Sequence, residues 1–228
     1  MTSAFVICLV VIALFLLVVL VWRLVSRRAS LPCPAWLSWI VEIDNPFPSS
    51  FNTETIIEGL ELRPGMKVLD AGCGPGRLTI PVAKKIAPEG EVIAVDIQAG
   101  MLRKAQAKAQ AAGLTNIHFL HAGIGEGMLG KNQFDRALLV TVLGEIPDRV
   151  GSLEEIYGAL KAGGILSVTE IVFDPHYQSR AAILRLASCV GFREKSFSGN
   201  RISFTLNLEK PTSEIGEGRQ GRLRPQAA

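Results

Sequence analysis

Cysteine is scarce in this chain, and no two cysteines are spaced as a CxxC pair. The four cysteines, Cys8, Cys33, Cys73 and Cys189, are too scattered for a disulfide framework and carry no zinc-binding signature. We therefore predict a reduced protein without a metal site. Acidic residues are absent from the first 28 positions, whereas the rest of the chain balances all 21 acidic residues with as many basic ones. A nucleic-acid-binding domain needs a surplus of positive charge, so this balance argues against nucleic-acid partners.

Charged residues of either sign are missing from the first 22 positions. Ala4 to Trp22 reads AFVICLVVIALFLLVVLVW, and a helix of that length spans about 28 Å, close to the thickness of the hydrocarbon core of a bilayer. Arginines follow this run rather than precede it, unlike the charges of a secretory signal peptide. We expect residues 4–22 to form a transmembrane helix of a single-pass membrane protein, with the N-terminus outside and the body in the cytoplasm.

Two features mark the boundaries of the remaining segments. These are a high proline content and the absence of a regular spacing of apolar residues. Four prolines between residues 29 and 50 disfavour a continuous helix there, so residues 23–50 are predicted to be a juxtamembrane connector. Residues 211–228 are polar and aperiodic, which predicts a disordered tail. The intervening residues 51–210 are enough for one domain of ordinary size.

Helical and strand patterns alternate along this domain. Ser152 and Glu155 have the spacing of a helix capping box, and residues 198–200 have the composition of a hairpin turn. The predicted helices are 52–60, 77–87, 98–112, 153–161 and 179–190, and the predicted strands are 67–70, 92–95, 117–120, 136–142, 165–171, 193–197 and 202–209. This alternation indicates helices on both faces of an open sheet. The predicted fold class is α/β: a Rossmann-like, doubly wound, mostly parallel seven-stranded sheet with one antiparallel strand, preceded by one transmembrane helix.

A glycine-rich turn follows the first predicted strand, with the sequence Asp70-Ala-Gly72-Cys-Gly74-Pro-Gly76. Glycines allow the backbone to approach a ligand closely, and the start of the next helix suits an anionic group of that ligand. Asp96 ends the second predicted strand, where an acid can accept hydrogen bonds from both ribose hydroxyls of a nucleoside. These features predict a nucleoside-containing ligand at the carboxyl ends of the strands.

The spacing of the glycines separates two classes of cofactor. Dinucleotide-binding turns have the pattern GxGxxG, whereas this turn is GxGxG with Asp70 two residues before the first glycine. A carboxylate at that place repels a pyrophosphate and attracts an ammonium group. The predicted ligand is therefore an amino acid joined to a ribonucleoside, which describes S-adenosylmethionine (SAM) and not NAD.

The segment VLDAGCGPGRLT, from Val68 to Thr79, resembles the first motif of class I SAM-dependent methyltransferases. The likeness extends over residues 52–209 and is greatest to small methyltransferases akin to the quinone-biosynthesis methylases. It implies SAM as the cofactor. The contacts that it implies are Asp70, Gly72, Cys73, Gly74 and Gly76 with the methionine part, Asp96 with the ribose, Ile97, Gly123 and Ile124 with adenine, and Thr141 and Val142 near the methyl group.

Two positions depart from the pattern of that family. Gly123 stands where relatives usually carry an acid for the adenine amino group, so this hydrogen bond is either lost or supplied by the backbone or by Glu126. Gly144 and Glu145 stand where relatives often carry a paired histidine. The chemistry of the acceptor is therefore open at this point.

Methyl transfer from a sulfonium needs alignment of donor and acceptor, and a base only where the acceptor loses a proton. Glu145 and His176 are candidates for that base, and Tyr177 for an orienting hydroxyl, in a predicted loop over the site from Glu170 to Tyr177. The alternative for this loop is an ordinary turn whose histidine and tyrosine are half buried.

The small domain and the predicted anchor favour a small, hydrophobic or membrane-associated methyl acceptor, such as a quinone precursor, a lipid amine or a thiol. The predicted partners are this acceptor and the membrane. Two other functions are left open: a non-catalytic SAM-binding or assembly protein, and a nicotinamide-dependent reductase. The sequence does not indicate an oligomeric state.

Overall fold

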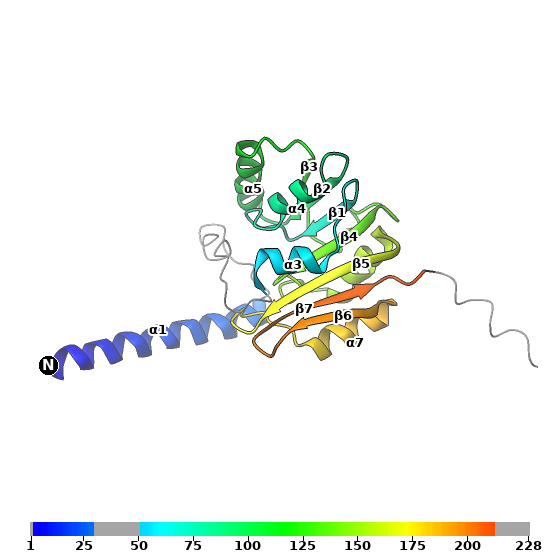
Figure 1. Cartoon of the computed structure of the whole chain (residues 1–228). Helices are drawn as coiled ribbons and strands as arrows, with labels where there is room; N and C mark the ends of the chain where they lie inside the picture. Colours follow the sequence, from blue (N-terminus) through cyan, green and yellow to red (C-terminus); the bar gives the residue numbers. More distant parts are fainter. Residues whose placement is uncertain (1, 30–50, 213–228) are drawn as a thin grey trace, which may run out of the picture.

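The structure, a computed structural model, describes residues 2–29 and 51–212 (Figure 1). Helices and strands alternate along the body as predicted, with ends that differ from the prediction by a few residues. In chain order the elements are α1 (Thr2–Ala29), α3 (Thr53–Gly59), β1 (Lys67–Ala71), α4 (Thr79–Ile86), β2 (Glu91–Asp96), α5 (Ala99–Ala111), β3 (Ile117–His121), β4 (Phe134–Val140), α6 (Arg149–Ala159), β5 (Leu160–Ile171), α7 (Arg180–Val190), β6 (Arg193–Gly199) and β7 (Ser203–Glu209).

The strands form one seven-stranded sheet with the order β3-β2-β1-β4-β5-β7-β6. Neighbouring strands are parallel from β3 to β5, and β7 is antiparallel to both β5 and β6. This confirms the predicted sheet, including its single antiparallel strand. From β1 the chain adds β2 and β3 towards one edge of the sheet, and from β4 it adds the remaining strands towards the other edge. The direction in which strands are added therefore reverses between β1 and β4. In open α/β sheets, ligands bind at the carboxyl ends of the strands beside such a switch point.

Each face of the sheet packs against its own set of helices, because successive side chains of a strand point to opposite faces. Val68 and Leu69 of β1 illustrate this alternation. The core on the side of Val68 includes Ile56 of α3, Val82 and Ile86 of α4 and Leu102 of α5. The core on the side of Leu69 includes Leu153 and Ile156 of α6, Ile183 of α7, and Phe204 and Leu206 of β7. Both faces are therefore covered, as a doubly wound sheet requires.

The start of α6 differs from the sequence prediction. The helix begins at Arg149, because the Asp148 carboxylate caps it by accepting a backbone N–H at 2.9 Å. Ser152 and Glu155 therefore lie inside the helix and do not form a capping box. Instead, Glu155 accepts the backbone N–H of Leu129 at 2.9 Å, which fixes the long connection between β3 and β4 to α6.

Strand β5 also begins earlier than predicted, at Leu160, directly after α6. The glycines that were expected to end the preceding helix, Gly163 and Gly164, lie inside the strand. Gly163 has φ of +75°, and the pairing of β4 with β5 shifts register between Phe134 and Arg136. This irregularity accommodates the glycine pair within the strand.

The N-terminal apolar run forms part of α1. Within residues 2–29 and 51–212, however, no helix is both long enough and apolar enough to cross a membrane. Helix α1 continues past Trp22 into the arginine-containing segment, so apolar and basic residues share one helix. The predictions of a transmembrane helix over residues 4–22 and of a single-pass membrane protein with its body in the cytoplasm are therefore contradicted. Most of the predicted connector (30–50) and of the predicted tail (213–228) lies outside the described residues.

Candidate active site

The glycine-rich loop lies at the switch point of the sheet. It follows β1, whose neighbour β4 pairs with it in parallel, Asp70 opposite Leu138. On the other side, the backbone N–H groups of Gly72 and Cys73 donate to the carbonyl of Val95 in β2, at 2.8 and 2.9 Å. The loop is thus attached to the end of β2 and lies beside the end of β4, at the edge of the sheet where a ligand is expected.

Asp70 is a buried acid at the end of β1. Its Oδ2 accepts a hydrogen bond of 2.6 Å from the hydroxyl of Thr79, the first residue of α4. Burial raises the pKa of the Asp70 carboxyl to about 6, although the Thr79 hydrogen bond acts in the opposite direction. An acid in this state gains strongly from a nearby cation, because the cation compensates the lost hydration of the carboxylate.

Asp96, at the end of β2, accepts hydrogen bonds from two backbone segments, the glycine-rich loop and the turn that follows β2. Its Oδ2 accepts the N–H of Gly74 at 2.9 Å, and its Oδ1 accepts the N–H of Gln98 at 2.8 Å. Burial raises the pKa of Asp96, and these two hydrogen bonds oppose the shift. Each carboxylate oxygen has a second lone pair, so Asp96 can fix the glycine loop and still accept hydrogen bonds from a ligand.

The glycines of the loop have positive φ, and two of them have different steric surroundings. Gly72 has φ of +77°, and a Cβ added there would lie 2.4 Å from Cγ2 of Val142. Gly74 has φ of +53°, and an added Cβ would have no atom of the described residues within 4 Å. Gly72 is therefore required by packing, whereas no described residue packs against the position of a side chain at Gly74. Between them, burial raises the pKa of the Cys73 thiol, which keeps it unreactive.

The predicted adenine contacts lie beyond β2 and β3. Ile97 is 59% exposed, and its carbonyl accepts a hydrogen bond of 2.9 Å from Nε2 of His121. A Cβ added to Gly123 would lie 2.7 Å from Oε1 of Glu126. The Glu126 carboxylate therefore occupies the space that a side chain at position 123 would need. Ile124 follows Gly123 in the chain.

The residues after β4 take an unusual conformation. Thr141 has φ of +56°, which is strained for a β-branched residue. Its backbone N–H donates to the carbonyl of Thr169 in β5 at 2.9 Å, and its hydroxyl donates to the carbonyl of Val140 at 2.8 Å. The turn brings Val142 against Gly72, so the end of β4 and the glycine loop pack directly on each other.

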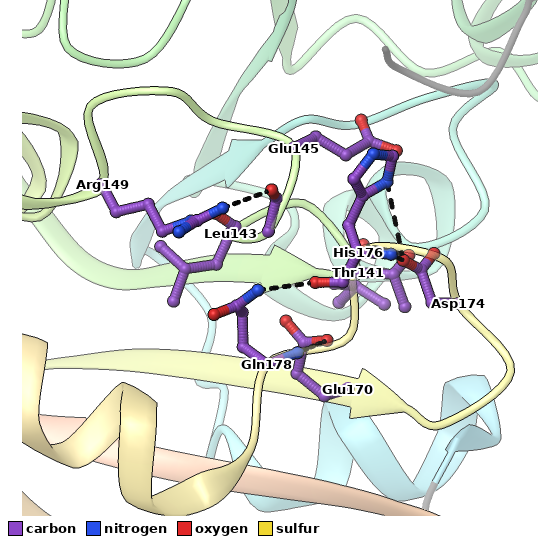
Figure 2. Close-up of polar contacts among 10 residues, drawn as sticks. Thr141, Leu143, Glu145, Arg149, Glu170, Asp174, His176 and Gln178 are labelled. Carbon is purple, nitrogen blue, oxygen red and sulfur yellow. Dashed lines mark hydrogen bonds and ion pairs between the residues drawn. The ribbon is translucent and has the colours of Figure 1, made fainter. Parts of the chain in front are cut away.

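The loop after β4 also contacts the loop after β5. A Cβ added to Gly144 would lie 1.9 Å from the carbonyl oxygen of His176, so the approach of the two loops requires glycine. Arg149 holds the same turn, because its guanidinium donates to the carbonyls of Leu143 and Gly144 at 3.2 and 2.9 Å. Figure 2 shows the two loops with their polar side chains gathered between them.

His176 lies in this cluster and faces two acids. Its Nδ1 is 3.9 Å from Oε1 of Glu145 and 3.8 Å from Oδ1 of Asp174, and its ring is buried. The structure thus brings together Glu145 and His176, both predicted as candidates for a base. Tyr177 instead packs edge to face against Phe204 of β7, with ring centroids 6.2 Å apart, and its catalytic role stays a prediction.

Glu170, near the end of β5, is a further acid of this cluster and is 1% exposed. Its Oε2 accepts the backbone N–H of Gln178 at 3.2 Å, whereas its Oε1 has no hydrogen-bond partner in the part of the chain that the structure describes. Burial is the main cause that raises the pKa of Glu170 to about 8; Asp174 and Glu145 act in the same direction, and the hydrogen bond from Gln178 acts in the opposite direction. The sequence contained a signal for this residue, an acid inside a largely apolar strand. No comparable pattern in the sequence predicted the hydrogen bond from Thr79 to Asp70.

The comparison with known proteins agrees with this geometry. A methyltransferase-domain family matches residues 62–204, which is more than half of the chain. The chain belongs to this methyltransferase family. The family is described as a methyltransferase domain, and its fold is shared with solved SAM-dependent methyltransferases.

Curated relatives of this methyltransferase include enzymes named demethylmenaquinone methyltransferase. The protein from Geobacillus stearothermophilus is 31% identical over 110 residues, which are 48% of this chain and 47% of that protein. The protein from Listeria welshimeri is 33% identical over 108 residues, 47% of this chain and 46% of that protein. The chain therefore spans about half the length of the curated relatives it matches.

Solved structures share the fold. A SAM-dependent methyltransferase from Aquifex aeolicus has a TM-score of 0.69 and 22% identity, over 78% of this chain and 100% of the other. The [4+2]-cyclase SpnF has a TM-score of 0.63 and 18% identity, over 70% of this chain and 80% of the other. At these identities the likeness shows the fold alone, and it includes a protein named for a different reaction.

Proposed function

We propose that this methyltransferase acts on a small, largely apolar acceptor that carries an oxygen substituent, with an aromatic quinone precursor as the favoured class. The observation that carries the proposal is the composition of the carboxyl edge of β5. The polar cluster around Glu170 is followed by Phe173, which is 73% exposed. The carbonyl of Ile202 accepts a hydrogen bond from the backbone N–H of Val172, the residue before Phe173, so Ile202 lies near Phe173. The side chain of Ile202 is 47% exposed. A polar group beside exposed apolar side chains suits an acceptor with an apolar body and a polar substituent.

The described residues fit SAM. A bare backbone with open space at Gly74 stands between two buried acids, Asp70 and Asp96, as an amino acid joined to a nucleoside requires. When bound, SAM supplies an activated methyl carbon. We assign Asp70, Gly72, Cys73, Gly74 and Gly76 to the methionine part, Asp96 to the ribose, Ile97, Gly123, Ile124 and Glu126 to adenine, and Thr141 and Val142 to the surroundings of the methyl group.

His176 and Glu145 are proposed to handle the proton of the acceptor. When a hydroxyl oxygen of the acceptor would take the methyl group, the bond from the methyl carbon to the sulfonium sulfur would break and S-adenosylhomocysteine would leave. The O–H bond of the acceptor breaks in the same step, and His176 accepts the proton. The imidazolium so formed lies within ion-pair distance of Glu145 and Asp174, which stabilise its charge. The proton then leaves to water. The pair therefore serves an acceptor that must lose a proton, such as a phenol.

A methyl-transfer assay with the full chain tests this function. The protein is incubated with SAM labelled on its methyl group and with reduced demethylmenaquinone, a phospholipid amine or an apolar thiol. We expect label in the quinol product, and much less of it at low SAM concentration with the variant Asp70→Asn, which binds SAM more weakly. Label only in the amine or thiol would overturn the acceptor class.

Two further outcomes correspond to the other functions that the sequence left open. Binding of SAM by calorimetry without transfer to any acceptor would indicate a non-catalytic SAM-binding protein. Affinity for NADH well above that for SAM would indicate a reductase. Either result would refute the proposed function.

A further inference from the structure

One oxygen atom of the polar cluster has no partner among the described residues 2–29 and 51–212. Oε1 of Glu170 is buried and makes no hydrogen bond to any of them, although Oε2 accepts one from Gln178. A buried polar atom left unpaired costs about 1–3 kcal/mol, so native structures rarely keep one without a use. This atom is therefore a candidate for contact with a ligand.

Other polar groups of the cluster have structural partners. The side-chain amide of Gln178 donates to the carbonyl of His176 at 2.8 Å, and Oδ1 of Asp174 accepts the backbone N–H of His176 at 2.6 Å. Arg149 donates to two carbonyls of the loop after β4. These contacts hold the two loops in place. Oε1 of Glu170 makes no contribution of this kind.

Glu170 also lies next to the segment that we assign to the methyl group. The residue before it, Thr169, accepts the backbone N–H of Thr141 at 2.9 Å, so the end of β5 is bonded to the turn after β4. Figure 2 shows Glu170 beside Gln178, whose backbone N–H its Oε2 accepts. The end of β5 that carries Glu170 therefore adjoins the turn where we place the methyl group.

We propose that Glu170 is an acceptor-binding residue, whose Oε1 makes a hydrogen bond with a hydroxyl or carbonyl oxygen of the methyl acceptor. This inference rests on the proposed function and specifies the substituent that the acceptor must carry. It favours an oxygenated acceptor over a cationic amine.

The charge state of Glu170 supports an oxygen partner. The pKa of Glu170 is raised to about 8 by burial and by the nearby acids, so the carboxyl group is mainly protonated at neutral pH. Because Oε2 accepts the N–H of Gln178, the proton resides on Oε1. A neutral carboxyl group in this orientation donates to an oxygen atom and offers no charge to an ammonium group.

The test compares two probes that differ only in their polar group. Hydroxymethylnaphthalene is neutral and aminomethylnaphthalene is a cation at neutral pH. Calorimetry measures the binding of each to the full chain saturated with S-adenosylhomocysteine, so that no turnover is needed. The variants are Glu170→Gln, which keeps a neutral donor, and Glu170→Leu, which removes it. Glu194→Gln, in an exposed ion pair with Arg180, is the matched control.

We expect the alcohol to bind wild type, Glu170→Gln and the control within about threefold of each other, and Glu170→Leu about three- to tenfold more weakly, the value of one neutral hydrogen bond. The amine should bind wild type more weakly than the alcohol. Equal binding of the alcohol to all variants would overturn the proposal. Tight binding of the amine that Glu170→Gln abolishes would also overturn it, in favour of a cation site.

Infrared spectroscopy provides a readout that is independent of affinity. Wild type at neutral pH should show the carbonyl band of a protonated carboxyl group, absent from Glu170→Gln, and the band should shift when the alcohol binds. A band that does not move would count against contact. Glu170→Gln should be at least as stable as wild type to thermal unfolding, since it removes a costly buried acid and keeps an oxygen that accepts the N–H of Gln178, whereas Glu170→Leu should be less stable than Glu170→Gln because that N–H loses its acceptor. If no acceptor is methylated, the proposed function fails, but these binding results still decide the role of Glu170.

Discussion

Replacement of Asp70 by asparagine should stabilise the fold and weaken the binding of SAM. Burial raises the pKa of Asp70 from 3.8 to about 6 in the folded chain, so the folded state keeps this proton over a pH range in which the unfolded state loses it. Stability therefore falls as the pH rises from about 4 to about 6, and the full cost is present above the folded pKa. At 1.36 kcal/mol per pKa unit, the cost is about 3 kcal/mol.

Denaturant unfolding at two pH values measures this cost. At about pH 7.5 we expect Asp70→Asn to be more stable than wild type by about 1–3 kcal/mol, and at about pH 4 the difference should largely disappear. SAM binding should change in the opposite sense. An amide cannot pair with an ammonium group, so the affinity should fall about tenfold to a hundredfold, the value of a charge-assisted hydrogen bond. In wild type, the affinity should also fall as the pH drops below about 6, because Asp70 then becomes neutral.

Thr79→Ser, which keeps the hydroxyl that donates to Asp70, is the control and should behave as wild type in both assays. A stability difference of the same size at both pH values would show that ionisation of Asp70 does not oppose folding. Unchanged SAM affinity of Asp70→Asn would refute the contact with the ammonium group.

Three further variants test other parts of the site. Asp96→Ala should weaken SAM binding by about 3 kcal/mol, through lost charge-assisted hydrogen bonds, and an unchanged calorimetric affinity would reject the ribose assignment. Gly74→Ala should lose only about 1–2 kcal/mol of stability, from its positive φ, yet bind SAM poorly, whereas Gly72→Ala, which clashes with Val142, should lose roughly 2–5 kcal/mol. Equal stability losses in denaturant unfolding would contradict the difference in packing. Gly144→Ala should displace the loop after β5 and lower kcat with little change in SAM affinity, and an unchanged kcat would show that this loop takes no part in the reaction.

Much of the fold could be predicted because its signals are local. A short apolar strand that ends in an acid, followed by glycines, can be recognised in a dozen residues, and Asp70 and Asp96 were placed at strand ends in this way. Local patterns were less reliable where two interpretations compete. The spacing of Ser152 and Glu155 suggested a cap, but Asp148 caps α6, and Glu155 is bonded to a distant loop. The apolar N-terminal run suggested a transmembrane helix, which the structure contradicts.

The sequence by itself determined the order of strands and helices along the chain and the positions of the two acids, Asp70 and Asp96, that we assign to SAM, since these depend on period and on residues close together in the chain. Only the tertiary structure decided which distant groups meet: Gly144 with His176, Asp96 with Gly74, and Thr141 with the strand that carries Glu170. It also showed that one oxygen of Glu170 is buried and has no hydrogen-bond partner among the residues that the structure describes. Burial and pairing arise from contacts between segments that fold together, and no single segment of the sequence contains that information.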